Sequence, residues 1–208
     1  MLGLLARKVG MTQVFDDAGN LVPVTVMRID PNVVIAKKTA EADGYAAVVI
    51  GFDDAKKNRV TKARAGQFPE NIPPKKKIRE LRDFEKDVAV GDSLGIDVLE
   101  GIRYVDVSGV SKGKGFQGVV KRYGHGGGRK THGSKFHREP GSTGQNTYPH
   151  RTFKNKKLPG RMGRENTTVL SLRVVKTDPE KQLIMVKGAV PGINKGLVLV
   201  RAAVKKGR

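Results

Sequence analysis

Residues 111–166 limit the possible folds of this chain more than any other part, because they cannot build a hydrophobic core. Only nine of these 56 residues are Val, Leu, Met, Phe or Tyr, none is Ile or Ala, and twelve are Gly. Burying so little apolar surface cannot offset the backbone entropy lost on folding, which is about 1–2 kcal/mol per residue. We therefore expect this segment to be disordered when the protein is alone, and not to form a second domain.

The same segment carries most of the positive charge of the chain. It holds 14 basic and 2 acidic residues, a net charge of +12, whereas residues 1–110 hold 17 basic and 16 acidic residues. Residues 167–208 add nine basic and two acidic residues, and the whole chain has a net charge of +20. A field of this strength implies a polyanionic partner, with nucleic acid as the first candidate and an anionic membrane as the second.

The sequences on either side of the basic segment are typical of short β-strands. Runs rich in Val and Ile, separated by turn residues, occupy residues 21–29, 32–39, 45–52, 104–110, 167–177, 182–190 and 196–204. Closely spaced strands without long helices between them indicate an antiparallel sheet that curls into a barrel. Ile78, Leu81 and Phe84 have helical spacing, so we expect residues 53–95 to be an insertion that is partly helix and partly loop.

The expected fold is therefore mainly β, with an antiparallel β-barrel formed by residues 1–110 and 167–208. It has a small helical insertion and a long basic internal loop extension at residues 111–166. A long insertion within a compact domain is usually functional, and we expect this one to become ordered against a polyanion. The basic residues predicted to contact phosphates are Lys112, Lys114, Lys121, Arg122, Arg129, Lys130, Lys135, Arg138, Arg151, Lys154, Lys156, Lys157, Arg161 and Arg164.

Aromatic residues are spaced through the same extension, at Phe116, Tyr123, Phe136, Tyr148 and Phe153. Aromatic side chains can stack on unpaired bases, and the glycines between the basic residues let the backbone approach phosphates closely. For Phe116 and Phe153, packing onto the barrel is an equal alternative.

Two glycine-rich stretches resemble nucleotide-binding motifs without completing them. Residues 113–118, GKGFQG, fit the dinucleotide fingerprint, but Gly124 and Gly126 follow too closely for a crossover helix to form. Residues 124–131, GHGGGRKT, have Arg129 where the phosphate-binding loop requires Gly. We expect neither a cofactor nor a catalytic residue here.

Composition also bears on location and on metal binding. The chain has no Cys, and no apolar run reaches the roughly 20 residues of a membrane span. The uncharged run before Arg7 is too short to be the apolar core of a signal peptide. These features predict a soluble cytoplasmic protein. The four His residues lie near only two carboxylates, so we expect polar residues that face nucleic acid, and no metal site.

Six motifs resemble the bacterial family of large-subunit ribosomal protein three, from end to end of the chain. They occupy residues 3–15, 22–29, 106–122, 132–146, 153–163 and 186–192. The most specific is DVSGVSKGKGFQGVVKR at 106–122. The residues of this block that match the family's pattern in type and spacing are Asp106, Gly109, Ser111, Gly113, Lys114, Gly115, Gly118 and Arg122.

The resemblance implies a β-barrel bound to the large-subunit (23S) ribosomal RNA and an extension that reaches toward the peptidyl transferase centre. It also implies early assembly, contacts with neighbouring proteins fourteen and nineteen, and no small-molecule substrate. Some members carry a methylated Gln where this chain has Thr147, so that modification is not expected. The residues that match the tip of the extension are Gly141, Ser142, Thr143, Gly144, Gln145 and Asn146.

A sequence-neutral architectural DNA-binding protein is the alternative, because charge alone cannot separate DNA from RNA. Such a protein would more often show a helical dimer pattern or apolar wedges than a barrel with one basic internal loop.

Overall fold

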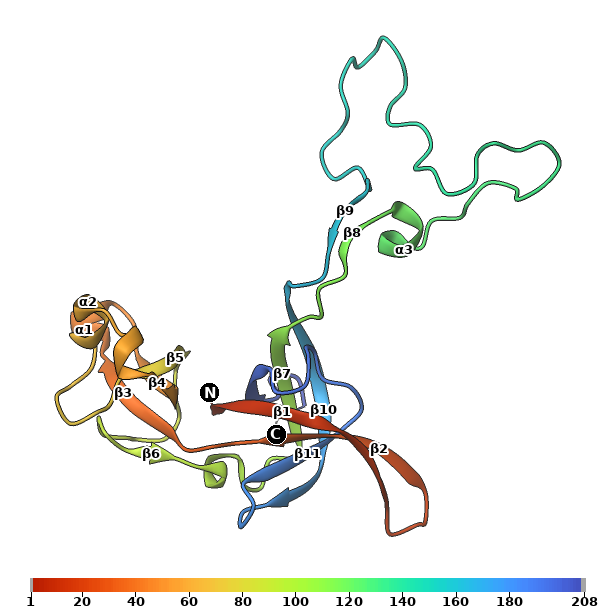
Figure 1. Ribbon diagram of the computed structural model, residues 1–208. Helices are drawn as coiled ribbons and strands as arrows, with labels where there is room; N and C mark the ends of the chain where they lie inside the picture. The colour runs from red at the N-terminus through yellow and green to blue at the C-terminus, as the bar shows by residue number, and fades with distance from the viewer. Residues whose placement is uncertain (1, 207–208) are drawn as a thin grey trace. The chain divides into compact units, whose positions relative to one another are not determined.

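The computed structural model describes residues 2–206, without the side chain of Lys57. The chain divides into two compact units (Figure 1): the first runs to Val110 and resumes at Asn166, and the second is Ser111–Glu165. The protein is mainly β, as the sequence predicts, and no helix within the described residues exceeds five residues.

Six antiparallel strands of the first unit pair in a closed ring, in the order β1-β12-β7-β10-β11-β2 and back to β1. Five of these strands match those that the sequence predicts. The sixth, β1, was not predicted. The six are β1 (Gly3–Phe15), β2 (Leu21–Arg28), β7 (Tyr104–Val110), β10 (Asn166–Asp178), β11 (Leu183–Lys187) and β12 (Leu197–Ala202).

Alternating Val and Ile side chains on these strands fill the core. Val105 and Val107 on β7 and Ile184 and Val186 on β11 are fully buried, while Met185, between the two in β11, is more exposed. A period of two is what a sheet with one face on the core requires.

The rest of the first unit is a four-stranded sheet in the order β5-β4-β3-β6. Its strands are β3 (Asn32–Lys38), β4 (Ala47–Asp54), β5 (Lys75–Arg82) and β6 (Ser93–Leu94). The first unit also has the short helices α1 (Ala40–Asp43) and α2 (Lys62–Ala65), and the 3-10 helices η1 (Lys57–Arg59) and η2 (Ile96–Leu99).

The helix expected from the spacing of Ile78, Leu81 and Phe84 is wrong, because this segment is the edge strand β5. Strand β5 pairs with β4, and both faces of the sheet are covered. Leu81 joins the main core, whereas Ile78 packs on a small cluster of Ile35, Phe68 and Ile72. Two apolar residues three apart lie on opposite faces of a strand, so their spacing imitated a helix.

Two buried charged side chains hold the closed ring together. The Asp106 carboxylate accepts hydrogen bonds from the backbone N–H groups of Ser171, at 2.7 Å, and Val204, at 3.3 Å. The Lys8 ammonium donates to the backbone oxygens of Val190, at 2.7 Å, and Gly192, at 3.2 Å.

Several charged residues on and beside the four-stranded sheet are paired with each other. The Tyr45 hydroxyl and the Glu80 carboxylate accept hydrogen bonds from the Lys38 ammonium and raise the pKa of Lys38 to about 12. Lys38 and Tyr45 in turn lower the pKa of Glu80, and Lys37 lowers the pKa of Asp87.

Across the described part of the chain, no helix has both the length and the apolar character needed to cross a membrane.

Candidate nucleic-acid interface

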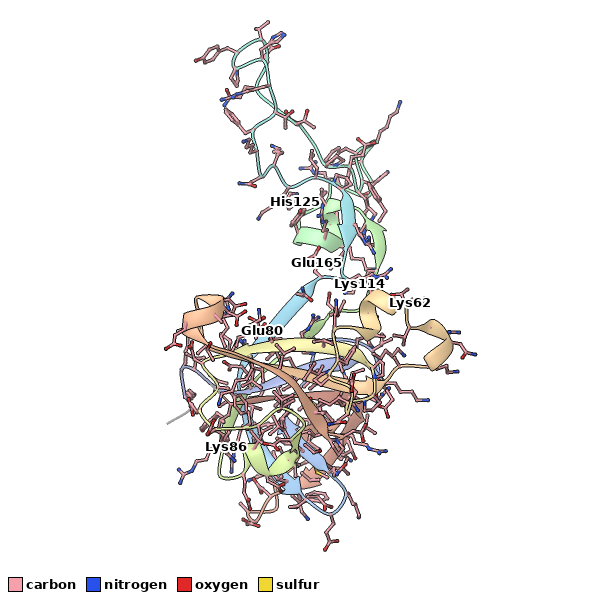
Figure 2. All side chains as sticks on the ribbon, turned by 90° about the vertical axis from the view of Figure 1, so that its left-hand side faces the viewer. Lys62, Glu80, Lys86, Lys114, His125 and Glu165 are labelled. Atoms are coloured by element: carbon pink, nitrogen blue, oxygen red, sulfur yellow. The ribbon has the colours of Figure 1, made fainter. Side chains whose placement is uncertain are left out.

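The two ends of the second unit run antiparallel and hydrogen bond to each other. Ser111 N–H donates to the Glu165 oxygen at 2.9 Å, and Lys114 N–H donates to the Met162 oxygen at 2.9 Å. Strand β8 (Gly115–Gln117) then pairs with β9 (Gly160–Met162). We call residues 111–117 and 160–165 the stem; Figure 2 labels Lys114 and Glu165 on it.

Gly163 allows the two sides of the stem to approach this closely. Its φ is +75°, and a Cβ at this position would overlap the Lys112 carbonyl oxygen and lie 3.0 Å from its carbon. A larger residue would meet backbone atoms, which cannot rotate away as the end of a side chain can.

A short helix, α3 (Val119–Tyr123), begins directly after Gly118. Helix α3 has five residues and ends at Gly124, which adopts the left-handed conformation at φ 70°. This agrees with the expectation that the glycines after residue 118 prevent a long crossover helix. Strand β8 before it pairs antiparallel with β9. This arrangement lacks the parallel strand–helix–strand unit that a dinucleotide site requires.

Arg122, one of the predicted RNA-contacting residues, also holds α3 in place. Its Nη1 donates to the Leu158 oxygen at 2.8 Å, and its guanidinium lies 4.9 Å from the centre of the Tyr123 ring. Arg122 is half-buried, so part of its hydrogen-bonding capacity serves the second unit itself.

The glycines of the second near-motif serve a backbone contact within the unit. Gly128 N–H donates to the His137 oxygen at 3.0 Å, and a Cβ at Gly128 would overlap the Phe136 oxygen. The close approach that glycine permits here is therefore used by the chain itself.

The other thirteen predicted phosphate-contacting residues are all exposed on the second unit. Its two acidic residues, Glu139 and Glu165, cannot neutralise fourteen basic ones. In the first unit, by contrast, Arg7 pairs with Asp53 at 2.5 Å and Lys75 with Asp54 at 2.6 Å. The second unit therefore keeps a large excess positive charge at its surface.

All five aromatic side chains of the second unit are exposed, with Tyr148 at 87% and Phe116 at 76%. Phe153 is also exposed, and the Arg151 guanidinium lies 5.7 Å from the centre of its ring. The two most exposed rings, Tyr148 and Phe116, leave most of their surface open for stacking on bases.

Five of the six predicted tip residues, 142–146, line one hollow of about 440 Å³ together with His150, Arg151 and Thr152. The Ser142 hydroxyl donates to the Gly144 oxygen at 2.6 Å, and the tip residues are all exposed. The hollow therefore presents hydroxyl, amide and backbone groups around a single cationic side chain, Arg151.

His125, just after α3 in Figure 2, is one of four histidines in the second unit. Among the residues that the structure describes, no three His, Asp or Glu side chains gather in a way that could hold a metal ion.

The sequence reasoning missed a second basic cluster, in the first unit. Arg64 on α2 and Lys76, Lys77 and Arg79 on β5 line a hollow of about 550 Å³. The near-neutral average over residues 1–110 concealed this cluster, which a charge count over a shorter window would have found.

Comparisons with known proteins agree on one family. A family model described as ribosomal protein L3 matches residues 77–182. The chain is 57% identical over 208 residues to the "Large ribosomal subunit protein uL3" of Treponema pallidum (strain Nichols), and 52% identical over 208 residues to that of Treponema denticola; each alignment covers both chains completely. It is also 50% identical over 205 residues to the protein of that description from Geobacillus kaustophilus, covering 98% of this chain and 96% of the relative.

Proposed function

The chain belongs to the ribosomal protein L3 family, and from this premise we propose that it is a structural component of the large ribosomal subunit. The second unit binds the large-subunit (23S) ribosomal RNA. The closed ring of the first unit acts as the β-barrel that carries this unit between its strands β7 and β10.

One observation carries the RNA-binding proposal: thirteen exposed basic side chains on a unit that has only two carboxylates. Lys and Arg contacts to phosphates supply most of the sequence-independent affinity for nucleic acid. The exposed aromatic rings favour RNA, since unpaired bases, which are common in folded RNA, can stack on them.

The neutral tip suits a different task from the rest of the second unit. Residues 141–146 contain no Lys or Arg, and their small polar side chains favour directional hydrogen bonds to bases or 2′-hydroxyls over phosphate neutralisation. Together with the resemblance, this supports a position of the tip near the peptidyl transferase centre, where it performs no chemistry itself.

Contacts with the neighbouring proteins fourteen and nineteen, and a role early in assembly, are part of the proposal. An apolar face of the β1–β2 hairpin supports a protein contact. Phe15 is paired opposite Leu21, Met11 lies on the same face, and all three side chains are exposed. Exposed apolar patches of this kind commonly mark protein interfaces.

The salt dependence of RNA binding tests the proposal. We expect the substitutions Lys130→Gln, Lys135→Gln, Lys154→Gln and Lys156→Gln together to make the slope of log K against log salt shallower by roughly 3, because four phosphate contacts are lost. These four lysines are exposed and lie outside the stem.

A duplex DNA of matched length provides the second arm of this experiment. Weaker binding to DNA than to large-subunit RNA at the same salt concentration is expected. A wild-type slope in the four-lysine variant, or equal affinity for the two nucleic acids, would favour the architectural DNA-binding alternative or another function.

A further inference from the structure

The near-neutral charge of the first 110 residues is the sum of two opposed regions. Residues 55–79 hold nine basic residues and a single acidic one, Glu70, whereas residues 80–100 hold two basic and seven acidic residues. In Figure 2, Lys62 on α2 and Lys86 in the acidic region lie on different sides of the first unit. Nine of the 17 basic residues among the first 110 therefore lie in one stretch of the sequence, residues 55–79.

The basic region surrounds the hollow of about 550 Å³ between α2 and the edge strand β5, which we call the α2–β5 hollow. Lys76, Lys77 and Arg79 line it from β5 and are exposed, and Arg64 lines it from α2 and is half-buried. Among the described residues that line the hollow, none is acidic.

Hydrogen bonds and packing fix the shape of the hollow. The Arg64 guanidinium donates to the backbone oxygens of Lys75, at 3.1 Å, and Lys76, at 2.8 Å, which ties α2 to the edge of β5. Phe68 and Ile72, which follow α2, are buried in the small cluster beneath the sheet. Arg64 is thus held in place at the hollow, while Lys76, Lys77 and Arg79 line it as exposed side chains.

Lysines near the hollow differ from those that line it. Lys75 is buried against Asp54 at 2.6 Å, and Lys38 pairs with Glu80 at 3.1 Å. Lys76, Lys77 and Arg79 instead lie around a hollow without carboxylates, where their charges repel one another unless an anion lies between them.

We propose that the α2–β5 hollow is a second RNA-binding surface, which receives phosphate groups of the ribosomal RNA backbone. The inference rests on the proposed function, because it assigns a further contact to the same RNA from a different unit. Arg and Lys are suited to such contacts through charge and hydrogen bonding, and the side chains of Thr61 and Gln67 in the same lining are also common phosphate partners.

The composition of the hollow favours RNA over an acidic protein. Protein interfaces are enriched in aromatic residues, Met and Arg and depleted in Lys. The two Arg of this lining suit either partner, but its two Lys and the lack of an aromatic residue among its described members favour RNA. A second explanation for lysines on the edge strand β5 is that they prevent pairing with the edge of another sheet. This explanation accounts for the charge along the edge, but it does not require a concave surface.

A charge-removal experiment tests the proposal on the full-length protein. Lys76→Gln, Lys77→Gln and Arg79→Gln together should make the salt slope for large-subunit RNA shallower by about 2 to 3. The matched control, Arg173→Gln, Lys181→Gln and Lys187→Gln, removes three exposed basic residues from β10, β11 and the turn between them. Thermal melting of both variants checks that the fold is retained.

A wild-type slope in the Lys76, Lys77 and Arg79 variant, or an equal change in the control, would overturn the proposal. If that variant keeps the wild-type slope while the four-lysine variant of the second unit flattens it, the proposed function stands and only the α2–β5 hollow is rejected. If neither variant changes the slope, the proposed function itself fails.

Crosslinking identifies the occupant directly. Because the chain has no Cys, Gln67→Cys places a unique thiol in the lining of the hollow, to which a photo-crosslinker can be attached. In reconstituted large subunits we expect an adduct on ribosomal RNA. An adduct on a protein would overturn the inference. So would the absence of an adduct at position 67 when the same reagent, attached at Thr147→Cys, labels RNA. Failure at both positions would count against the proposed function.

Discussion

Asp106 shows how a residue with the spacing of an RNA-binding motif can serve the fold. It stands in the most specific sequence block, yet its side chain is 2% exposed and accepts hydrogen bonds from two backbone N–H groups. One of these belongs to Ser171, which has φ 54° and lies where the register of β10 against β7 shifts. Asp106 therefore stabilises an irregular part of the closed ring.

We expect Asp106→Ala to lower the free energy of unfolding by about 2–4 kcal/mol, because two backbone donors lose their acceptor. Urea unfolding of the full-length protein measures this change. Asp106→Asn keeps one acceptor oxygen and should cost less. A change below about 0.5 kcal/mol for the Ala variant would show that water or another group replaces the carboxylate.

Among the predicted phosphate-contacting residues, Arg122 could not be separated from the others by sequence. Its charge and spacing match those of its neighbours, and only the structure shows the contacts of its side chain with Leu158 and Tyr123. A residue's type can predict that it binds an anion, but not how much of its hydrogen bonding the chain itself uses.

At the scale of elements, the strands rich in Val and Ile were predictable, whereas β1, which has two Val and no Ile, was not. Residues 4–6 of β1 are buried in succession, whereas residues 11–13 are all exposed. No period of two is visible in such a strand. The prediction for β5 failed for another reason, since the packing of its second face on Ile35, Phe68 and Ile72 becomes apparent only in the folded structure.

The geometry of the second unit depends on the stem, and Gly163 is the most constrained residue of the stem. We expect Gly163→Ala to speed hydrogen exchange of the Ser111 and Lys114 amides, because the added Cβ forces the two sides of the stem apart. Gly118→Ala is the matched control, since a Cβ there meets no atom within 4 Å. Equal protection in both variants would show that the stem adapts to a side chain at position 163.

At the scale of the whole molecule, composition predicted the candidate interface better than the details of the fold. The segment 111–166 stood out because it combines few apolar residues, many glycines and a net charge of +12. The α2–β5 hollow did not, because its charge is balanced by acidic residues elsewhere in the first unit. An average over a long segment hides a basic cluster that a shorter window would reveal.

The neutral tip and the basic remainder of the second unit should differ in what they control. We expect Gly144→Arg to leave the yield of large subunits nearly normal but to alter peptide-bond formation or the response to antibiotics that bind the peptidyl transferase centre. The substitutions at Lys130, Lys135, Lys154 and Lys156 should instead lower the yield. Purified subunits allow yield and activity to be measured separately. A tip variant that abolishes yield while its few particles behave normally would mark the tip as an assembly anchor.

Replacing residues 112–164 by a short Gly/Ser linker separates the two units for the central test. Both hydrophobic clusters consist of residues from the first unit, and Val110 remains paired with Asn166. We therefore expect this variant to unfold cooperatively, which makes its RNA binding interpretable.

The most direct test is the salt dependence of binding to large-subunit RNA, measured for the full chain and for this deletion variant. If the full chain contacts about eight phosphates, its log K should fall against log salt with a slope near −6 to −7. The slope of the deletion variant should be shallower by at least about 4, because residues 112–164 carry most of these contacts. A deletion variant that keeps the slope and affinity of the full chain would contradict the claim that this segment is the principal RNA-binding part of the molecule.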